Sequence, residues 1–389
     1  MNLGSRAPRF PDRFLWGAAT SAHQVEGNQD NDWTQWEKTG ACVEVSGDAC
    51  DHYNRYEEDI ALLAGLGLNS FRFSIEWSRI EPRPNDFSEE AIAHYSDVLT
   101  ACHEHDLVTA VSFHHFTNPR WVADGGGWEN PRVAELFARF CEHTARSLGS
   151  DIDLVVTINE PNMPPLLGYA DAVFPPGKRD PEARMAATHN FIAAHEAARD
   201  VIHEHTDAPV GIAVAMADWH LVEGGDAELG QIRSLREDVF LASARSDDYI
   251  GVNTYTRHRV GPDGFMDVED GVELTAMGYE FYPSAVGATV RRAAELTERP
   301  VIVTEVGIGT NDDTRREAFI EAAIHEIDQC VSDGIDMRGF YYWSALDNFE
   351  WHHGYGPKFG LVAVDRDTQK RTVKRSGRFL GDIASARRA

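Results

Sequence analysis

The chain has 389 residues, of which 42% are hydrophobic and 25% are charged, the composition of an ordinary globular protein. Its 63 acidic residues outnumber its 36 basic ones and give a formal net charge of −27, which repels nucleic acids and anionic membranes and argues against both as partners. No stretch approaches the roughly 18 consecutive apolar residues of a membrane-spanning helix, and the first residues contain no apolar core of a signal peptide. We therefore expect a cytoplasmic protein.

Short runs of β-branched and aromatic residues recur along the chain and predict strands. They lie at residues 14–20, 70–76, 109–115, 153–160, 210–216, 249–255, 300–307 and 339–346. Stretches with helical spacing of apolar residues lie between them, at residues 55–66, 89–105, 132–148, 181–205 and 315–332. This alternation predicts a parallel sheet with helical crossovers.

Eight uninterrupted strand–helix units favour a closed barrel over an open doubly wound sheet, and no glycine-rich phosphate loop follows the first strand. We predict an α/β protein consisting of a single catalytic (β/α)₈ TIM barrel over residues 1–389. The segments 223–230 and 261–271, rich in glycine and acidic residues, are expected to be surface loops.

Five scattered cysteines, an odd number without Cys-x-x-Cys spacing, predict free and mostly buried thiols. Only Cys42 and Cys50 are close enough in sequence to suggest a disulfide that closes a loop. The histidine pairs at 114–115 and 352–353 lack accompanying carboxylates at metal-ligand spacing. We expect neither a metal nor a cofactor.

Two glutamates have the same local setting, each at the end of a predicted buried strand. Glu160 ends the run DLVVTINE and precedes Pro161, and Glu305 ends the run PVIVTE and precedes Val306 and Gly307. The carboxyl ends of barrel strands meet at one mouth, where the fourth and seventh strands lie opposite each other. Two carboxyl groups facing one pocket are the requirement for cutting a glycosidic bond with retention of configuration.

The other predicted strand ends add polar and aromatic groups that suit a polyhydroxylated ligand. These groups are Gln24, Glu26, Arg72, Glu76, His115, Asn159, Asn253, Tyr255 and Trp343. A cation such as Arg72 and a hydroxyl such as Tyr255 would stabilise the ionised form of Glu305. Glu160 has no cation evident in the sequence, so burial and the second carboxylate should raise its pKa and let it keep a proton.

Five ordered segments resemble the signatures of a known family. They are FLWGAATSAHQVEG at 14–27, FRFSIEWSRI at 71–80, TINEP at 157–161, WSALDNFEW at 343–351 and GYGPKFG at 354–360. The chain resembles glycoside hydrolase family 1, the retaining β-glucosidases and β-galactosidases, and the resemblance extends from end to end.

The resemblance implies a role for each matching position. Glu160 would be the acid/base, Glu305 the nucleophile, Arg72 and Tyr255 the groups that orient it, and Asn159 the ligand of the sugar 2-hydroxyl. The remaining implied sugar contacts are Gln24, His115 and Glu350 at the outer hydroxyls, Trp343 under the ring, Trp351 through its indole N–H, Phe359 beside the 6-position and Asn253 next to the nucleophile.

The implied activity is that of a retaining, exo-acting β-glycosidase. It would act on terminal β-D-glucosyl residues, and also on β-D-galactosyl and β-D-fucosyl residues, of small-molecule glycosides or oligosaccharides. A transglycosylase could use the same site. A 6-phospho-β-glycosidase is disfavoured because Glu350 would repel a phosphate, and a non-catalytic sugar-binding barrel because both glutamates are present.

Two departures from the family pattern concern the reaction centre and its surroundings. The nucleophile motif usually reads Thr-Glu-Asn-Gly, whereas Val306 here lacks an amide, so we expect less side-chain support for this strand end. The chain is shorter than most members, chiefly between Glu160 and Glu305, which predicts trimmed loops and an open leaving-group side. Candidate contacts to the leaving group are Trp33, Trp128 and Phe174.

Overall fold

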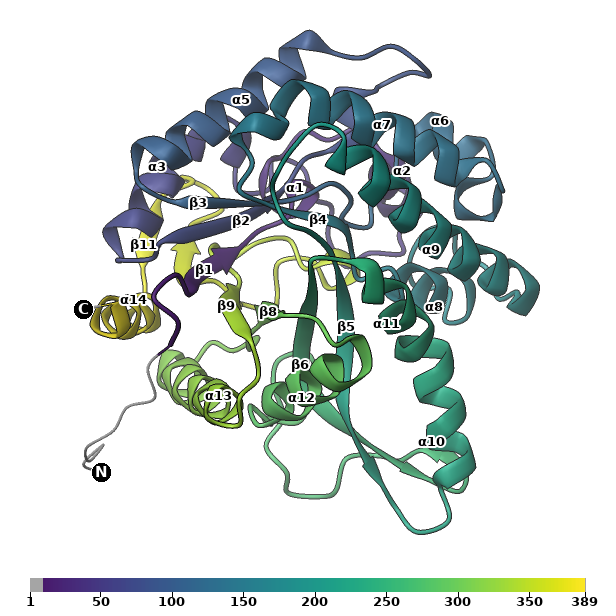
Figure 1. The fold of residues 1–389 in the computed structure, drawn as a ribbon, viewed down its shortest axis with the longest axis vertical. Coiled ribbons are helices and arrows are strands. Elements are labelled where there is room, and N and C mark those ends of the chain that lie inside the picture. Colours follow the sequence, from purple (N-terminus) through teal and green to yellow (C-terminus); the bar gives the residue numbers. More distant parts are fainter. Residues whose placement is uncertain (1–9, 389) are drawn as a thin grey trace.

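The computed structural model describes residues 10–388, which form a closed barrel of parallel strands surrounded by helices (Figure 1). In the order in which they pair around the barrel, the strands are β1 (Leu15–Ala19), β2 (Ser70–Ser74), β3 (Val108–Ser112), β4 (Leu154–Asn159), β5 (Val210–Leu221), β6 (Tyr249–Gly261), β8 (Val301–Val306) and β9 (Met337–Trp343). β9 pairs in parallel with β1 and closes the ring. All eight predicted strands are present, so the predicted TIM barrel is confirmed.

The predicted helices are also confirmed, with ends that shift by up to three residues. The longer helices are α3 (His52–Gly65), α5 (Glu89–Glu104), α7 (Val133–Leu148), α9 (Pro181–His203), α12 (Ala285–Thr297), α13 (Asp313–Ser332) and α14 (Arg375–Arg388). The shorter ones are α1 (Ala22–Val25), α2 (Asp32–Glu37), α4 (Trp77–Ile80), α6 (Arg120–Asp124), α8 (Met163–Tyr169), α10 (Asp226–Arg233) and α11 (Val239–Ser243).

Short side chains at the N-caps set where several of these helices begin. Ser88 accepts a hydrogen bond from the backbone N–H of Ala91 at the start of α5, and Asp312 accepts one from Thr314 at the start of α13. Asp180 caps α9 directly before Pro181, which lacks the N–H that this position would leave unpaired. The caps thus fix how each helix enters the ring around the barrel.

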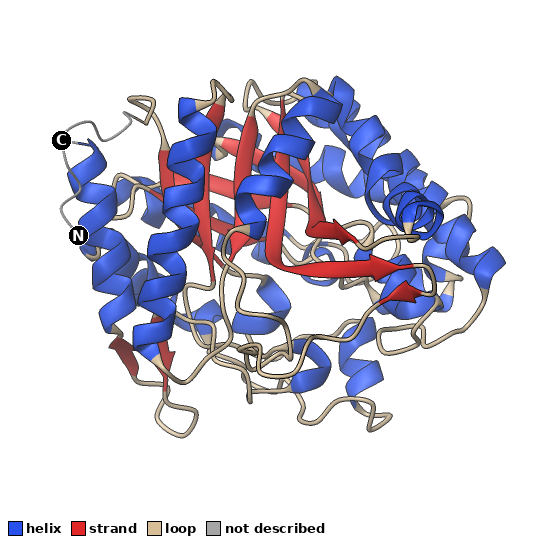
Figure 2. Ribbon diagram, turned by 90° about the horizontal axis from the view of Figure 1, so that it is seen from below, coloured by secondary structure: helices blue, strands red, loops and turns tan. Residues whose placement is uncertain are grey.

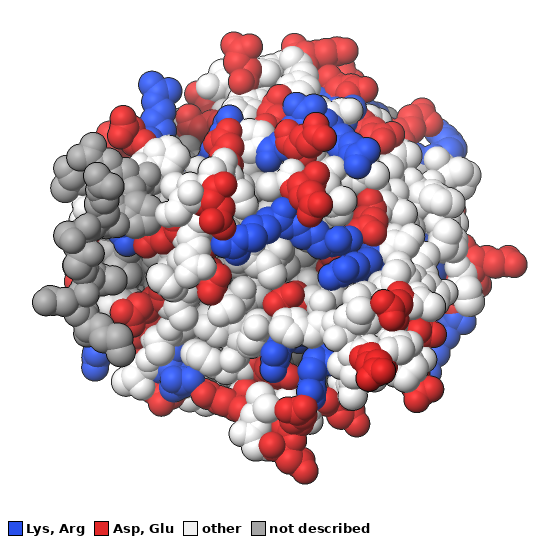
Figure 3. Space-filling view, turned by 60° about the horizontal axis from the view of Figure 1, so that its bottom comes forward, with Lys and Arg blue, Asp and Glu red and all other residues white. Residues whose placement is uncertain are grey.

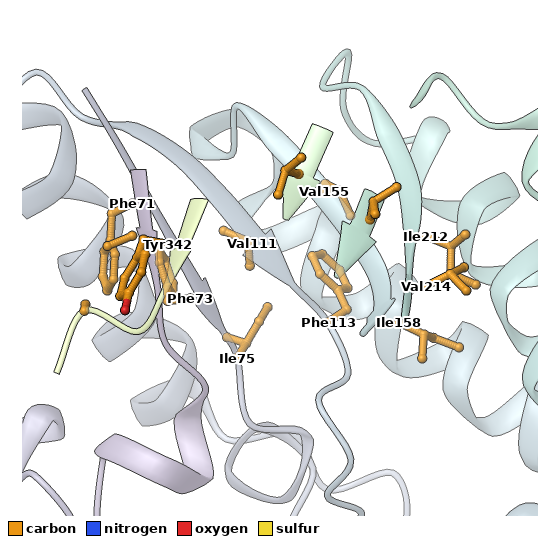
Figure 4. Close-up of a cluster of buried hydrophobic side chains, with 14 of the residues drawn as sticks. Phe71, Phe73, Ile75, Val111, Phe113, Val155, Ile158, Ile212, Val214 and Tyr342 are labelled. Carbon is orange, nitrogen blue, oxygen red and sulfur yellow. The ribbon is translucent and has the colours of Figure 1, made fainter. Parts of the chain in front are cut away.

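Two apolar layers hold the barrel together. The larger one lies between the strands and the helices, where Phe71, Val111 and Val155 point outward from neighbouring strands (Figure 4). The smaller one fills the barrel interior and includes Ala110 and Tyr341. Because side chains alternate across a strand, residues next to the outer layer point inward. This alternation places Arg72, between Phe71 and Phe73, inside the barrel.

β5 and β6 are longer than predicted and extend beyond the barrel as a two-stranded ribbon (Figure 2). Within the segment 261–271, expected to be a loop, β7 (Gly264–Phe265) pairs with the end of β6 as a hairpin. Residues 266–271 form a loop, as predicted. The loop expected at 223–230 was wrong, because α10 begins at Asp226. Leu229 of α10 packs on Trp219 of β5, so tertiary packing overrides the glycines and acidic residues around it.

Short elements complete the chain. They are η1 (Gly127–Glu129), η2 (Gly149–Asp151), the π-helical turn η3 (Ser234–Asp238), η4 (Ala244–Ser246), η5 (Trp351–His353) and the antiparallel pair β10 (Val362–Val364) and β11 (Arg371–Val373). The predicted free thiols are confirmed, since Cys50, Cys102, Cys141 and Cys330 are buried and Cys42 is half-buried. The loop-closing disulfide between Cys42 and Cys50 is not formed, and Cys50 instead donates to the carbonyl of Asp347 at 3.3 Å.

On the face drawn in Figure 3, acidic side chains are spread over the surface with basic side chains among them. None of the helices within residues 10–388 has the length and apolar character needed to cross a membrane. The expected cytoplasmic location and the extent of one domain over residues 1–389 stay predictions.

Candidate active site

A cavity of about 410 Å³ opens at the carboxyl ends of the barrel strands. Its size is in the range of small-molecule sites, and its position is the one where TIM barrels carry their active sites. Four carboxyl groups line it, those of Glu160, Glu237, Glu305 and Glu350, together with the rings of Trp343 and Phe359. The two glutamates singled out from the sequence therefore do face one cavity.

Glu305, on β8, is held at both carboxylate oxygens. Arg72 Nη1, from β2, lies 2.5 Å from Oε1, and Tyr255 Oη, from β6, donates to Oε2 at 2.7 Å. Both partners of the ion pair are buried. Arg72 also donates to the carbonyl of Thr304 at 3.1 Å and to Asn159 Oδ1 at 2.6 Å, so its own position is fixed. Arg72 and Tyr255 therefore both contact the Glu305 carboxylate, as predicted.

Glu160 follows β4 and has a different environment. Its Oε1 accepts a hydrogen bond from Asn253 Nδ2 at 2.9 Å, and it forms no ion pair with any residue in the described range 10–388. Burial, followed by the charge of Glu305, raises the pKa of Glu160 to about 8, although Asn253 and Arg72 act in the opposite direction. At neutral pH Glu160 thus carries a proton.

The backbone at Glu160 is also unusual, because its φ of 48° lies in the left-handed region. Its N–H donates to the carbonyl of Ala213 on β5 at 2.7 Å, and its carbonyl accepts from the N–H of Met163 at 2.9 Å. These bonds hold a conformation that costs a non-glycine residue on the order of 1–3 kcal/mol. With this backbone conformation, the Glu160 side chain lines the cavity at the end of β4.

Asn159 and Asn253 connect the two glutamates. Asn159 Oδ1 accepts from Arg72 at 2.6 Å and from Asn253 Nδ2 at 3.0 Å, while Asn253 Oδ1 accepts from Thr304 Oγ1 at 2.6 Å. One amide network thereby joins β2, β4, β6 and β8. The network aligns the side chains around the mouth before any ligand is bound.

His115 extends this network through Asn159. Asn159 Nδ2 lies 3.2 Å from His115 Nε2, and His115 Nδ1 is buried without a hydrogen-bond partner among the described residues. Burial and the charge of Arg72 lower the pKa of His115 well below its usual value. The imidazole is therefore neutral, and His115 lines the cavity.

Glu350 carries the second carboxyl group in the cavity that is protonated at neutral pH. Burial and the charge of Glu305 raise its pKa to about 8, opposed by hydrogen bonds from Trp343 and Gln24. Gln24 Nε2 lies 3.4 Å from Glu350 Oε2 and donates to the carbonyl of Phe349 at 2.7 Å. Gln24 is thus fixed in place, behind the residues that line the cavity.

Aromatic rings form the remaining walls near the carboxyl groups. The His115 ring is stacked with those of Trp343 and Trp351, at centroid distances of 5.8 and 6.0 Å. Phe359 meets the ring of Tyr255 edge-on at 6.1 Å. All the predicted sugar-contact positions are therefore gathered at one site, with Arg72, Asn159 and Gln24 in the layer behind its lining.

Two acids at predicted strand ends lie outside this cavity. Glu26 pairs with Arg79 at 2.7 Å and accepts a hydrogen bond from Tyr95 at 2.9 Å. Glu76 accepts from the hydroxyl of Thr117 at 2.9 Å. Both carboxylates therefore contact residues of neighbouring segments and not the cavity.

The structure shows how the strand end at Val306 is held without an amide side chain. Val306 is buried in the apolar layer between strands and helices, so its side chain points away from the cavity. The strand end is held by backbone pairing of Val306 with Thr254 and Tyr342. Gly307 permits this close pairing, because a Cβ there would lie 1.9 Å from the carbonyl oxygen of Trp343.

The leaving-group side of the cavity contains residues that the sequence did not single out. They are chiefly apolar and include Met163, Leu166, Leu167, Val173, Met216, Ala217, Trp219, Arg236, Glu237, His258 and Met277. Of the three predicted contacts, Phe174 lines this cavity. Trp33 and Trp128 are buried and line a neighbouring cavity instead. The ring of Trp128 stacks on Phe191 at 3.6 Å, which is structural packing.

The match to a family model decides the family. The model described as glycosyl hydrolase family 1 matches residues 6–228 and 237–389. The chain belongs to glycosyl hydrolase family 1. It is 29% identical to β-glucosidase A of Thermotoga maritima, over 96% of this chain and 97% of that protein, and 30% identical to a β-glucosidase of Agrobacterium sp., over 97% and 96%.

Solved structures of this family superpose closely on the chain. The crystal structure of the β-glycosidase BGL167 matches with a TM-score of 0.92 and 45% identity, covering 97% of each chain. The family 1 β-glucosidase of Thermotoga maritima matches with a TM-score of 0.94 and 28% identity, covering 98% of this chain and 99% of that one. The enzyme class of the chain is therefore that of the family 1 glycoside hydrolases.

Proposed function

We propose that this protein is a β-glucosidase that removes terminal, nonreducing β-D-glucosyl residues from small-molecule glycosides with retention of configuration. The observation that carries the proposal is the unequal setting of two carboxyl groups in one cavity. Glu305 has an arginine and a tyrosine hydroxyl on its oxygens, whereas burial and the Glu305 charge raise the pKa of Glu160 to about 8. One ionised and one protonated carboxyl group are the pair that a retaining glycosidase uses.

In the first step a Glu305 oxygen attacks the anomeric carbon while the bond from this carbon to the leaving oxygen breaks. Glu160 gives its proton to that oxygen, and the product is a glucosyl ester of Glu305. Arg72 and Tyr255 orient the attacking carboxylate through the bonds that they make to it.

The second step depends on a change in the charge of Glu305. Once Glu305 is esterified, its negative charge no longer raises the pKa of Glu160, so Glu160 ionises more readily. It then takes a proton from water, the water oxygen attacks the anomeric carbon, and Glu305 is released. Acid–base assistance of this kind is worth roughly 10²–10⁴ in rate.

The remaining groups are proposed to hold the sugar. Asn159 would bind the 2-hydroxyl, and Asn253 would keep both Asn159 and Glu160 in place. The outer hydroxyls would meet Gln24, Glu350 and His115. The aromatic positions are proposed to be Trp343 under the ring, Trp351 as an indole N–H donor and Phe359 beside the 6-position.

The same reaction centre suits β-D-galactosides and β-D-fucosides, which differ from glucosides only at the 4- and 6-positions. A transglycosylase differs only in whether water or a second sugar attacks the ester. A 6-phospho-β-glycosidase would need a cationic clamp at the sugar, and among the described lining residues the sole Lys or Arg is Arg236, on the leaving-group side. Hydrolysis of unphosphorylated glucosides is therefore our conclusion.

The anomer of the released sugar, followed by ¹H NMR during turnover of an aryl β-glucoside, tests the proposal. We expect β-glucose to appear first and to mutarotate later. Early α-glucose would refute the retaining mechanism. The matched Glu305→Ala variant should show no turnover while keeping its circular dichroism spectrum.

A further inference from the structure

Beyond the reaction centre the cavity continues along an apolar wall. The side chains that form this wall are Met163, Leu166, Leu167, Val173, Phe174, Met216 and Met277. An apolar wall favours a hydrophobic leaving group, because a second sugar would leave many hydroxyls without hydrogen-bond partners. The lining also includes three side chains that carry nitrogen donors or a charge, those of Trp219, His258 and Arg236.

Arg236 forms no ion pair with any of the described residues. Its guanidinium stands 4.7 Å above the ring of Phe265 and makes no ion pair or side-chain hydrogen bond within the described part of the chain. By contrast, Arg292 nearby is paired with both Glu237 and Asp238. In a chain with 63 acidic and 36 basic residues, an arginine left unpaired in a cavity is unusual.

Nearby acids do not supply the missing partner. Glu237 Oε1 accepts hydrogen bonds from Trp219 Nε1 at 2.6 Å and from the N–H of Ala217 at 3.1 Å, and its Oε2 lies 3.5 Å from Arg292 Nε. Burial raises the pKa of Glu237 to about 7, and its charge attracts Arg236 without forming an ion pair. Asp171 attracts Arg236 only from a distance, and Arg184 repels it. The guanidinium therefore faces the cavity as a partly desolvated cation without a counter-ion.

Arg236 lies in a part of the chain that the family model does not match. It lies on the π-helical turn η3, within the stretch 229–236 that the family model leaves unmatched. π-helical turns are inserted single turns that frequently occur at functional sites. This turn brings a cation to a cavity whose other ionisable acid groups are the carboxyl groups of Glu160, Glu305, Glu350 and Glu237.

We propose that Arg236 binds a carboxylate at the far end of the leaving group, so that the enzyme prefers glucosides of apolar, aromatic carboxylic acids. This inference rests on the proposed β-glucosidase function. A guanidinium matches a carboxylate with two parallel hydrogen bonds, and a desolvated cation gains more from such a pair than an exposed one. The net charge of −27 and the carboxyl groups at the reaction centre oppose any acid that does not reach Arg236.

The test compares a glucoside acid with its neutral methyl ester. The probes are 4-(β-D-glucosyloxy)cinnamate and its methyl ester, assayed by kcat/KM with the wild-type enzyme and with Arg236→Gln. The ratio of acid to ester should fall about tenfold or more in the variant, chiefly through a higher KM for the acid, as for the loss of a charge-assisted hydrogen bond. The ester should change by less than about twofold, since it makes no charged contact.

Arg233→Gln is the matched control. Arg233 belongs to the same segment, donates to the carbonyl of Trp219 at 3.4 Å and does not line the cavity. Its substitution should leave the acid-to-ester ratio unchanged. Raising the salt concentration should increase KM for the acid in the wild type but not in Arg236→Gln, because salt screens the pair.

The outcomes separate this inference from the function on which it rests. If both glucosides are hydrolysed and Arg236→Gln leaves their ratio unchanged, the carboxylate site is refuted and the β-glucosidase function stands. If the wild type hydrolyses neither, both proposals fall. Should Arg236→Gln fail to fold, Arg236→Lys and the salt dependence of the wild type decide, since a lysine keeps the charge but not the two parallel bonds.

Discussion

The alkaline limit of activity follows from the proton on Glu160. With its pKa at about 8, the protonated fraction of Glu160 is about nine-tenths at pH 7, one half at pH 8 and about one-tenth at pH 9. The protonated form is the active one in the first step. We therefore expect kcat/KM for a glucoside with a poor leaving group to stay nearly constant up to about pH 7 and to fall about tenfold per pH unit above about pH 8.

The substitution Glu160→Ala, assayed with two substrates, tests whether the decline in kcat/KM above pH 8 is caused by deprotonation of Glu160. Phenyl β-glucoside needs protonation of its leaving oxygen, so its kcat/KM should fall by roughly 10²–10⁴ at pH 7. 2,4-Dinitrophenyl β-glucoside needs little protonation, so its kcat/KM should fall far less and should lose the decline near pH 8. Equal losses on both substrates would refute the acid role of Glu160.

Glu350 provides the control, because burial and the Glu305 charge also raise its pKa to about 8. Glu350→Gln should weaken sugar binding but keep the decline in kcat/KM above pH 8. A decline that persists in Glu160→Ala and disappears in Glu350→Gln would show that the limit belongs to sugar binding and not to proton donation.

Two further substitutions probe the support of the nucleophile. Tyr255→Phe removes a charge-assisted hydrogen bond of 2.7 Å to Glu305 and should lower kcat/KM for the dinitrophenyl glucoside by about 10- to 100-fold with the melting temperature nearly unchanged, whereas a loss below twofold would speak against its orienting role. Gly307→Ala would place a Cβ 1.9 Å from the Trp343 carbonyl oxygen and should lower both the melting temperature and kcat. A variant as stable and active as the wild type would contradict the close strand pairing at this point.

The fold could be predicted from the sequence because each barrel strand has a local signature. β-branched runs mark the strands, and the helical spacing between them marks the crossovers. The extension of β5 and β6 could not be predicted, because beyond the barrel polar residues such as Asp218 and His220 replace the apolar run. α10 was missed for a related reason, since it depends on the contact of Leu229 with Trp219 across the sequence.

The reaction centre could be predicted because it lies at strand ends, where position in the sequence sets position in space. Arg72, Glu160 and Glu305 met as expected for this reason. The orientation of Val306 could not be predicted from the motif alone. It depends on which face of β8 the residue occupies and on the packing around it. Arg236 carries no sequence signal, because it lies on a π-helical turn whose direction is determined only by the packing around it.

Trapping of the covalent intermediate tests the central claim most directly. A 2-deoxy-2-fluoro-β-glucoside with an activated leaving group slows both steps, so the sugar should accumulate on the enzyme and be found by mass spectrometry after proteolysis. The account predicts one fluoroglucosyl group per chain, attached to the peptide that contains Glu305. An adduct on another residue, or complete turnover of the probe through α-configured product without any adduct, would contradict it.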